Sequence, residues 1–262
     1  MIHLWLSAFI GLLIPFMMTS FGAALVFLLR PKRAHLWQKI CLGFAAGIMT
    51  ASAVFSLLLP AMEEAAALEQ TPWLSVLSGF GTGVLFLLLF DSILPHIHPM
   101  GAHAEGIRVP WSRSTLLFFA VTLHNIPEGM AVGLSFALAL QHGEAALAAA
   151  FALSMGIAIQ NLPEGAAVSL PLAQAGVKRN KAFALGMASG AVEPVFAFIV
   201  LLCAPAIGPI MPFLLSFAAG AMLYVVAEEL IPEAHLGEHS HSATLSVMAG
   251  FALMMVLDTA LG

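Results

Sequence analysis

Two near-copies of one polar motif lie in consecutive apolar segments of the chain. The first copy reads His-Asn-Ile-Pro-Glu-Gly at residues 124–129, and the second reads Gln-Asn-Leu-Pro-Glu-Gly at residues 160–165. In each copy a His or Gln stands four residues before the Glu, and an Asn stands three residues before it. On a helix these spacings bring the three side chains to one face. The chemistry that such a face offers is the binding of a cation.

The two copies together supply a mixed set of nitrogen and oxygen donors. The set consists of His124, Asn125, Glu128, Gln160, Asn161 and Glu164. One imidazole, two carboxylates and three amides suit divalent first-row metals, zinc included. Two buried carboxylates that face each other without a cation repel, and a dication between them removes that cost. We therefore expect a metal centre built from the two motifs.

Several polar residues outside the motifs are further candidates. Glu193 lies well inside an expected helix, where an ionisable group is costly and points to function; the alternative is a carboxyl group hydrogen-bonded to a neighbouring helix. Asp91 and Glu229 lie near expected helix ends. They either form part of a release path for the cation or are ordinary solvated residues at helix ends. Met49 is a candidate only through a repeat described below, because a methionine usually fills gaps in a core.

The composition excludes most other classes of protein. The chain has 262 residues, of which 61% are hydrophobic and 9% are charged, and its mean hydropathy is +0.99. A soluble domain carries roughly a quarter charged residues. The net charge of −5 offers no basic surface for nucleic acid. Cys41 and Cys203 form no redox pattern, and we assign them to packing.

Apolar stretches of about 20 residues recur along the whole chain, enough to cross the hydrocarbon core repeatedly. We predict an all-α polytopic membrane protein, with residues 1–262 forming a single transmembrane domain. The eight expected helices cover residues 3–29, 35–62, 73–95, 113–141, 143–173, 181–205, 209–232 and 243–261. The metal centre is expected between the helices at 113–141 and 143–173.

The basic residues indicate the orientation in the membrane. All nine Lys and Arg residues lie in or beside the first, third and fifth connections, which alternation puts on one side. The positive-inside rule makes that side cytoplasmic, so both termini face outward. Two cytoplasmic loops, about 96–112 and 233–242, are rich in His. His96 and His98 in the first of them favour weak cation capture, although histidines also simply populate polar loops.

Two expected helices of opposite direction share a sequence pattern. Residues 46–49 read Ala-Gly-Ile-Met and are followed by Leu-Pro at 59–60. Residues 219–222 read Ala-Gly-Ala-Met and are followed by Ile-Pro at 231–232. Similar segments with opposed orientation are typical of inverted-repeat transporters, whose substrate sites lie near the midplane. Chance similarity between Ala- and Gly-rich helices is the competing explanation.

The motifs resemble those of the Zrt/Irt-like (ZIP) family of divalent-metal transporters, in particular its bacterial GufA-type branch. The resemblance rests on the two Asn-x-Pro-Glu-Gly motifs, on Gly-Ala-Val-Glu-Pro at 190–194, on Gly-Ile-Met at 47–49 and on Asp91 with Leu-Pro-His-Ile-His at 94–98. It implies an eight-helix fold with an inverted repeat around a binuclear metal centre. Gln160 and Asn161 depart from relatives that have His and Asp there, which puts the metal preference in doubt.

The resemblance also implies three groups of ligands. Met49, His124, Glu128, Gln160 and Glu164 match one metal position. Asn125, Glu128, Asn161, Glu164 and Glu193 match the other, and the two motif glutamates bridge both. Asp91, His96, His98 and Glu229 match a cytoplasmic exit route.

We therefore expect a transporter that moves a divalent cation into the cytoplasm by alternating access, across a bacterial plasma (inner) membrane. Zinc is the first candidate, with cadmium, iron, manganese and cobalt as competitors. The metal is the transported substrate, and no organic cofactor is expected. The expected partners are metal ions and the lipid bilayer, and the sequence leaves open whether the chain forms a homodimer. Two alternatives remain. One is an intramembrane zinc metallohydrolase, although no His-Glu-x-x-His is present. The other is a cation or proton channel that uses the glutamates as a relay.

Overall fold

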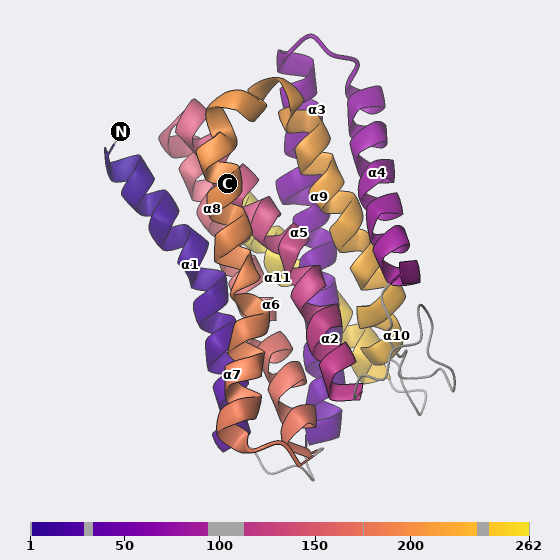
Figure 1. Cartoon of the computed structure of the whole chain (residues 1–262). Helices are drawn as coiled ribbons and strands as arrows, with labels where there is room; N and C mark the ends of the chain where they lie inside the picture. Colours follow the sequence, from indigo (N-terminus) through magenta and orange to yellow (C-terminus); the bar gives the residue numbers. More distant parts are fainter. Residues whose placement is uncertain (1, 29–33, 94–112, 175, 235–240, 262) are drawn as a thin grey trace.

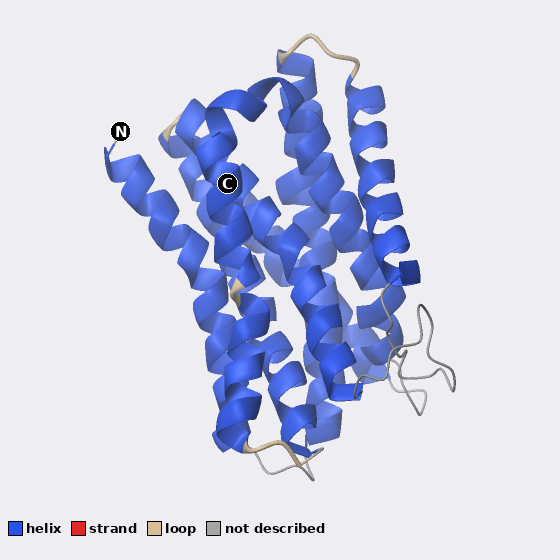
Figure 2. Cartoon of the chain, in the orientation of Figure 1, coloured by secondary structure: helices blue, strands red, loops and turns tan. Residues whose placement is uncertain are grey.

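The chain folds into a bundle of helices. The computed structural model describes residues 2–28, 34–93, 113–174, 176–234 and 241–261. Within these ranges every regular element is a helix and none is a strand (Figure 2). The all-α prediction is confirmed for this part of the chain. His96, His98 and nearly all of the two His-rich loops lie outside the described residues.

Five helices are uninterrupted: α1 (Ile2–Ala24), α4 (Pro72–Ile93), α5 (Arg113–His142), α6 (Glu144–Gln174) and α11 (His241–Leu261). Three further runs are composite. They are α2 (Ala34–Ala51), the π-helix η3 (Ser52–Leu58) and α3 (Leu59–Ala67); then α7 (Arg179–Gly190) and α8 (Val192–Ile207); and α9 (Met211–Val225), the π-helix η5 (Val226–Leu230) and α10 (Ile231–Ala234). Short 3-10 turns, η1 (Leu25–Phe27) and η4 (Gly208–Ile210), follow α1 and α8.

The described helices are those of an integral membrane protein. Six stretches are long and apolar enough to cross a bilayer: His3–Phe27, Lys39–Ala67, Pro72–Ile93, Ala146–Ala173, Arg179–Leu230 and His241–Ala260. The fifth stretch has 52 residues and is turned at η4, so it is long enough for two crossings. Helix α5 is not among the six. The total of eight crossings stays a prediction.

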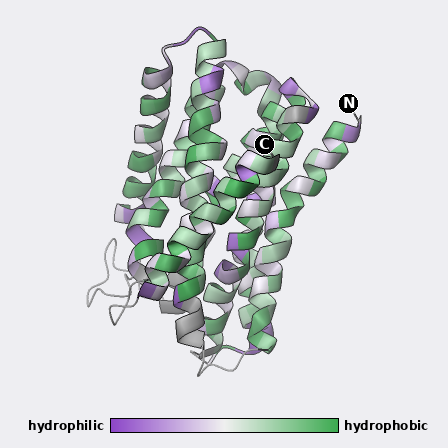
Figure 3. Ribbon diagram, turned by 180° about the vertical axis from the view of Figure 1, so that it is seen from behind, coloured by the Kyte–Doolittle hydropathy of each residue, from purple (hydrophilic) through white to green (hydrophobic). Residues whose placement is uncertain are grey.

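The outer faces of the helices are apolar. Leucines such as Leu6, Leu77 and Leu85 expose 58–63% of their surface. Hydrophobic colour runs along most of each helix in Figure 3, and hydrophilic colour lies near helix ends and at a few inner places. A surface of this kind is suited to contact with lipid tails.

Each irregularity in the composite runs lies beside a proline. The sequence predicted one helix over 181–205, but the structure ends α7 at Gly190 and begins α8 at Val192. Pro194 has no N–H for the carbonyl of Gly190, so the helical ladder is interrupted there. Pro60 and Pro232 each lie just after a π-helix, η3 or η5. The two segments that share a sequence pattern therefore share a local distortion as well.

The helices pack in close pairs. Helix α1 packs along α6 and α5 along α8, while α2 packs along α11 and α4 along α9. Figure 1 shows α5 and α6 in the middle of the bundle. Glycine permits the closest approaches: a Cβ atom added at Gly220 of α9 would collide with the backbone carbonyl oxygen of Phe80 in α4. Small residues let membrane helices approach in this way.

The two ends of the bundle differ in charge. Helices α2, α5 and α7 begin at its lower end in Figure 1, and α7 exposes Arg179 and Lys181 there. At the other end, His142 closes α5 and its Nε2 lies 2.8 Å from Glu64 Oε1 in α3. The charge asymmetry agrees with the predicted orientation, which itself stays a prediction.

Gly220→Ala should lower the stability of the bundle, because the new methyl group meets a backbone atom that has no side chain to rotate away. Overpacking of this kind costs about 1–3 kcal/mol. The matched control is Gly81→Ala in α4, where an added Cβ meets no atom within 4 Å and alanine has the better helix propensity. Thermal unfolding of the detergent-purified variants measures both. Equal midpoints for the two variants would contradict the close approach.

Candidate metal centre

The two motifs lie in the middle of α5 and α6, and both helices continue through their prolines, Pro127 and Pro163. Four of the six motif side chains are enclosed: Asn125, Glu128, Gln160 and Asn161 are at most 2% exposed. His124 and Glu164 are partly exposed. This is the placement that the helical spacing predicted.

The motif glycines set the distances to the neighbouring helices. A Cβ atom at Gly129 would collide with the backbone of Glu193 in α8. One at Gly165 would collide with the carbonyl oxygen of Thr19 in α1. The expectation that these glycines allow close helix approach is confirmed, and the partners are α8 and α1. The motifs are therefore held against two further helices that carry polar side chains.

The carboxylate of Glu128 lies between the two motif helices. Gln160 donates from Nε2 to Glu128 Oε1 at 2.8 Å. Glu164 and Glu193 are both close enough to interact electrostatically with Glu128. The sequence predicted that the two motif carboxylates face each other, and Glu128 and Glu164 do lie within range of electrostatic interaction.

Glu193 forms the second part of the centre. Asn161 donates from Nδ2 to Glu193 Oε2 at 2.6 Å, and the hydroxyl of Thr19 donates to Oε1 at 3.2 Å. Asn125 donates from Nδ2 to the carbonyl oxygen of Ser189 at 3.0 Å. Helices α6 and α1 thus both donate to one buried carboxylate of α8, and α5 is hydrogen-bonded to the end of α7.

Four oxygen atoms of the motifs have no hydrogen-bond partner. They are Asn125 Oδ1, Glu128 Oε2, Gln160 Oε1 and Asn161 Oδ1, and all four are buried. Among the described residues only two other buried side-chain atoms, Ser52 Oγ and Ser169 Oγ, are left in this way. A buried acceptor without a partner is costly. Each of the three amides already uses its N–H group on a neighbour. Carboxylate and amide oxygens that are free to accept are suited to a divalent cation.

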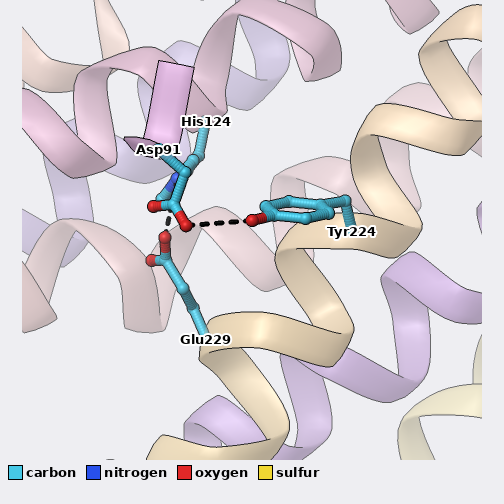
Figure 4. A network of polar contacts seen from close by, with 4 residues as sticks. All are labelled: Asp91, His124, Tyr224 and Glu229. Atoms are coloured by element: carbon cyan, nitrogen blue, oxygen red, sulfur yellow. Dashed lines mark hydrogen bonds and ion pairs between the residues drawn. The ribbon is translucent and has the colours of Figure 1, made fainter. Parts of the chain in front are cut away.

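His124 belongs to a network of polar contacts with Asp91, Tyr224 and Glu229 (Figure 4), and it also interacts electrostatically with the motif residue Glu164. Its Nε2 lies 2.9 Å from Glu229 Oε1 in η5. Beside this pair, the hydroxyl of Tyr224 donates to Asp91 Oδ2 at 2.9 Å. Asp91 interacts electrostatically with His124. The resemblance assigned His124 to the same metal position as Glu128. The structure pairs its imidazole with Glu229, a residue of the expected exit route, and the assignment of His124 as a ligand stays a prediction.

A complete ligand shell is not assembled from acidic, His and Cys side chains alone. No three of them in the described part of the chain are gathered so that they could hold a metal ion. One reason is that amides supply half of the motif donors, and another is that His124 contacts Glu229. Met49 is 2% exposed and packs in the hydrophobic core. Its role as a ligand stays a prediction, as does every metal assignment above.

Sequence reasoning missed two residues of these networks. Thr19 lies in the apolar helix α1, and only its position beside Ser20 marks it as a polar site. Tyr224 is the single tyrosine of the chain, which was an available signal. Neither residue belongs to a motif. Both make their contacts between helices that are distant in the sequence, and no local pattern marks such contacts.

Comparison with known proteins gives one consistent result. The sequence profile described as ZIP zinc transporter matches residues 103–258. The zinc transporter ZIPB of Bordetella bronchiseptica is 40% identical over 252 residues, which cover 94% of this chain and 79% of that protein. The zinc transporter GufA of Myxococcus xanthus is 36% identical, covering 79% and 81% of the two chains. The human zinc transporter ZIP11 is 32% identical, covering 98% and 97%.

If these four oxygens bind a cation, Zn²⁺ should stabilise the folded protein. At a free Zn²⁺ concentration of about one hundred times Kd, the gain is about 2.7 kcal/mol. The double variant Glu128→Gln plus Glu164→Gln should lose this gain, because amides are weaker ligands than carboxylates. Thermal unfolding with and without Zn²⁺ measures the effect, and Glu144→Gln, which changes an exposed carboxylate at the start of α6, is the control. The same stabilisation in the double variant would place the cation elsewhere.

Proposed function

Because the chain belongs to the ZIP zinc transporter family, we propose that it carries a divalent metal ion across a membrane. The metal is the transported substrate. The observation that carries this proposal is the set of four buried, unpartnered oxygens on Asn125, Glu128, Gln160 and Asn161. They lie in the middle of helices α5 and α6, and a divalent cation would satisfy oxygen acceptors of this kind.

The proposed metal centre is binuclear. One position uses Met49, His124, Glu128, Gln160 and Glu164, and the auxiliary position uses Asn125, Glu128, Asn161, Glu164 and Glu193. The electrostatic contact of Glu128 with both Glu164 and Glu193 supports carboxylates that serve two cations. The contact of His124 with Glu229 supports an imidazole that serves the metal centre and the exit route in turn.

Zinc is the proposed first substrate, because the relatives are named zinc transporters. Gln160 and Asn161 supply neutral oxygens where an imidazole or a carboxylate would favour zinc more strongly. Cadmium, iron, manganese and cobalt are therefore proposed as competitors.

The proposed mechanism is alternating access toward the cytoplasm. Its support is a symmetric packing pattern. Exchanging α1 with α8 and α6 with α5 turns the close pair α1–α6 into the close pair α8–α5. Exchanging α2 with α9 and α11 with α4 likewise turns the close pair α2–α11 into the close pair α9–α4. An inverted repeat of eight crossings accounts for this pattern, and such repeats surround substrate positions near the midplane.

The proposed route ends at the basic side of the protein. Asp91, His96, His98 and Glu229 form its exit, of which Asp91 and Glu229 lie in the network around His124. The proposed location is a bacterial inner membrane with both termini outside. The relatives are named as transporters and not as enzymes, which removes the ground for the metallohydrolase alternative.

Uptake of zinc into proteoliposomes tests the proposal. We expect saturable uptake that competing cadmium, iron, manganese or cobalt reduces in an order that ranks the substrates. Glu128→Ala plus Glu164→Ala should abolish uptake, since both bridging carboxylates are gone, and Glu144→Ala should retain it. Flux that rises without saturation favours the channel alternative. Uptake that persists in the double variant contradicts the assigned centre.

Acid should weaken zinc binding, because imidazole and carboxylate ligands bind metal only when deprotonated. Imidazole commonly gains its proton between about pH 7.5 and about pH 5.5, so the apparent Kd should be several times higher at the lower pH. Calorimetric titration of the purified protein at the two pH values measures this change. In His124→Ala the pH dependence should be shallower. A Kd that is the same at both pH values excludes His124 as a ligand.

A further inference from the structure

Thr19 contacts the auxiliary metal position from a helix that carries no part of either motif. It is fully buried in α1. Its side chain packs on Gly190 at the end of α7, where an added Cβ would lie 2.7 Å from Thr19 Cγ2. Its backbone carbonyl oxygen lies against Gly165. These contacts fix the place of the Thr19 side chain and leave its hydroxyl hydrogen as the one group free to turn.

That hydroxyl hydrogen has two acceptors. Thr19 Oγ1 lies 3.2 Å from Glu193 Oε1 and 3.2 Å from the carbonyl oxygen of Pro15. A hydroxyl has a single hydrogen to donate, and both distances are longer than is usual for an O–H···O bond, so neither bond is strong. The hydrogen can therefore turn from one acceptor to the other at little cost.

The two acceptor oxygens depend on the Thr19 hydroxyl to different degrees. The carbonyl oxygen of Pro15 lies in a continuous helix and can also accept the backbone N–H of Thr19. Glu193 is 2% exposed, and Thr19 is the only side-chain donor to its Oε1 among the described residues. The hydroxyl thus stabilises the carboxylate most when no cation is there.

We infer that Thr19 competes with the metal ion for Glu193 and so promotes release from the auxiliary position. This inference rests on the proposed function. When a cation leaves, the Thr19 hydroxyl donates to Glu193 Oε1 and stabilises the empty carboxylate. When a cation binds, the hydroxyl turns to the Pro15 carbonyl and keeps a hydrogen bond. Its contribution to the empty state exceeds that to the filled state, so it lowers the affinity for metal.

The sign of this effect separates the role from simple packing. Thr19→Val keeps the shape of the side chain and removes the donor, so it destabilises the empty state more than the filled state. We expect the Kd of the auxiliary position to fall about tenfold, which corresponds to about 1.4 kcal/mol. Hydrogen bonds to charged groups have net values of that order. Damage to packing would raise Kd instead.

Titration of Zn²⁺ into the detergent-purified full chain by calorimetry tests the inference. The auxiliary position is identified as the binding event that Glu193→Gln removes. Thr19→Val should tighten this event, and Thr19→Ser, which restores a hydroxyl, should return it to the wild-type value. Thr19→Ala, measured beside them, removes the same hydroxyl with a smaller side chain. In the Glu193→Gln background, Thr19→Val should not change the remaining Kd.

Uptake by proteoliposomes of the same preparations gives the second readout. Thr19→Val should lower both KM and the maximal rate, because tighter binding slows release, and Thr19→Ser should restore both. An unchanged or higher Kd in Thr19→Val and Thr19→Ala overturns the inference. In that case saturable wild-type uptake leaves the proposed function standing, whereas a wild-type protein that binds zinc without transporting it counts against the function itself.

Discussion

Buried carboxylates without a basic partner are the constraint on which the rest of this structure depends. All nine Lys and Arg residues lie in or beside three connections, and among the described residues no Lys or Arg is paired with a glutamate at the centre of the bundle. Amide and hydroxyl groups donate hydrogen bonds to these carboxylates instead. Gln160 donates to Glu128, and Asn161 and Thr19 donate to Glu193. Neutral donors hold a carboxylate less strongly than a salt bridge does. A cation can therefore compete for the carboxylates, which a permanent ion pair would prevent.

Close contact between backbones brings these donors within reach. The carboxylate of Glu193 lies beside the motifs because Gly129 lets α8 approach α5, and Thr19 reaches it because Gly165 lets α1 approach α6. Each of these glycines belongs to a motif whose Glu immediately precedes it. The ligand and the contact that positions its neighbours are thus encoded in adjacent residues. Pro15 has a related effect, because it leaves the carbonyl of Gly11 without its helical partner. That carbonyl accepts a hydrogen bond from the hydroxyl of Ser154 in α6 at 2.7 Å.

Much of the fold followed from the sequence because long apolar helices have a strong and local signal. The all-α class and the approximate ends of the helices agree with the structure, and so does the burial of the motifs. The break at Ala191 and the two π-helices were missed, although Pro194, Pro60 and Pro232 mark them. A proline shows that a carbonyl is left without a partner, but the packing of the neighbouring helices decides whether the chain turns, bulges or continues. The contacts of Thr19 and His124 were missed for a related reason, because they join helices that are far apart in the sequence.

The two kinds of contact between helices leave different room for change over evolutionary time. At Gly165 and Gly220 the opposing atom belongs to the backbone of another helix. A backbone carbonyl is the same in every residue, so no second substitution can make space for a larger side chain at either glycine. Glu128 and Gln160 meet through side chains, and such a pair can drift together while their contact persists. In a large set of related sequences the glycines should therefore be invariant without covarying partners, and paired replacement should be confined to the ligands and their donors.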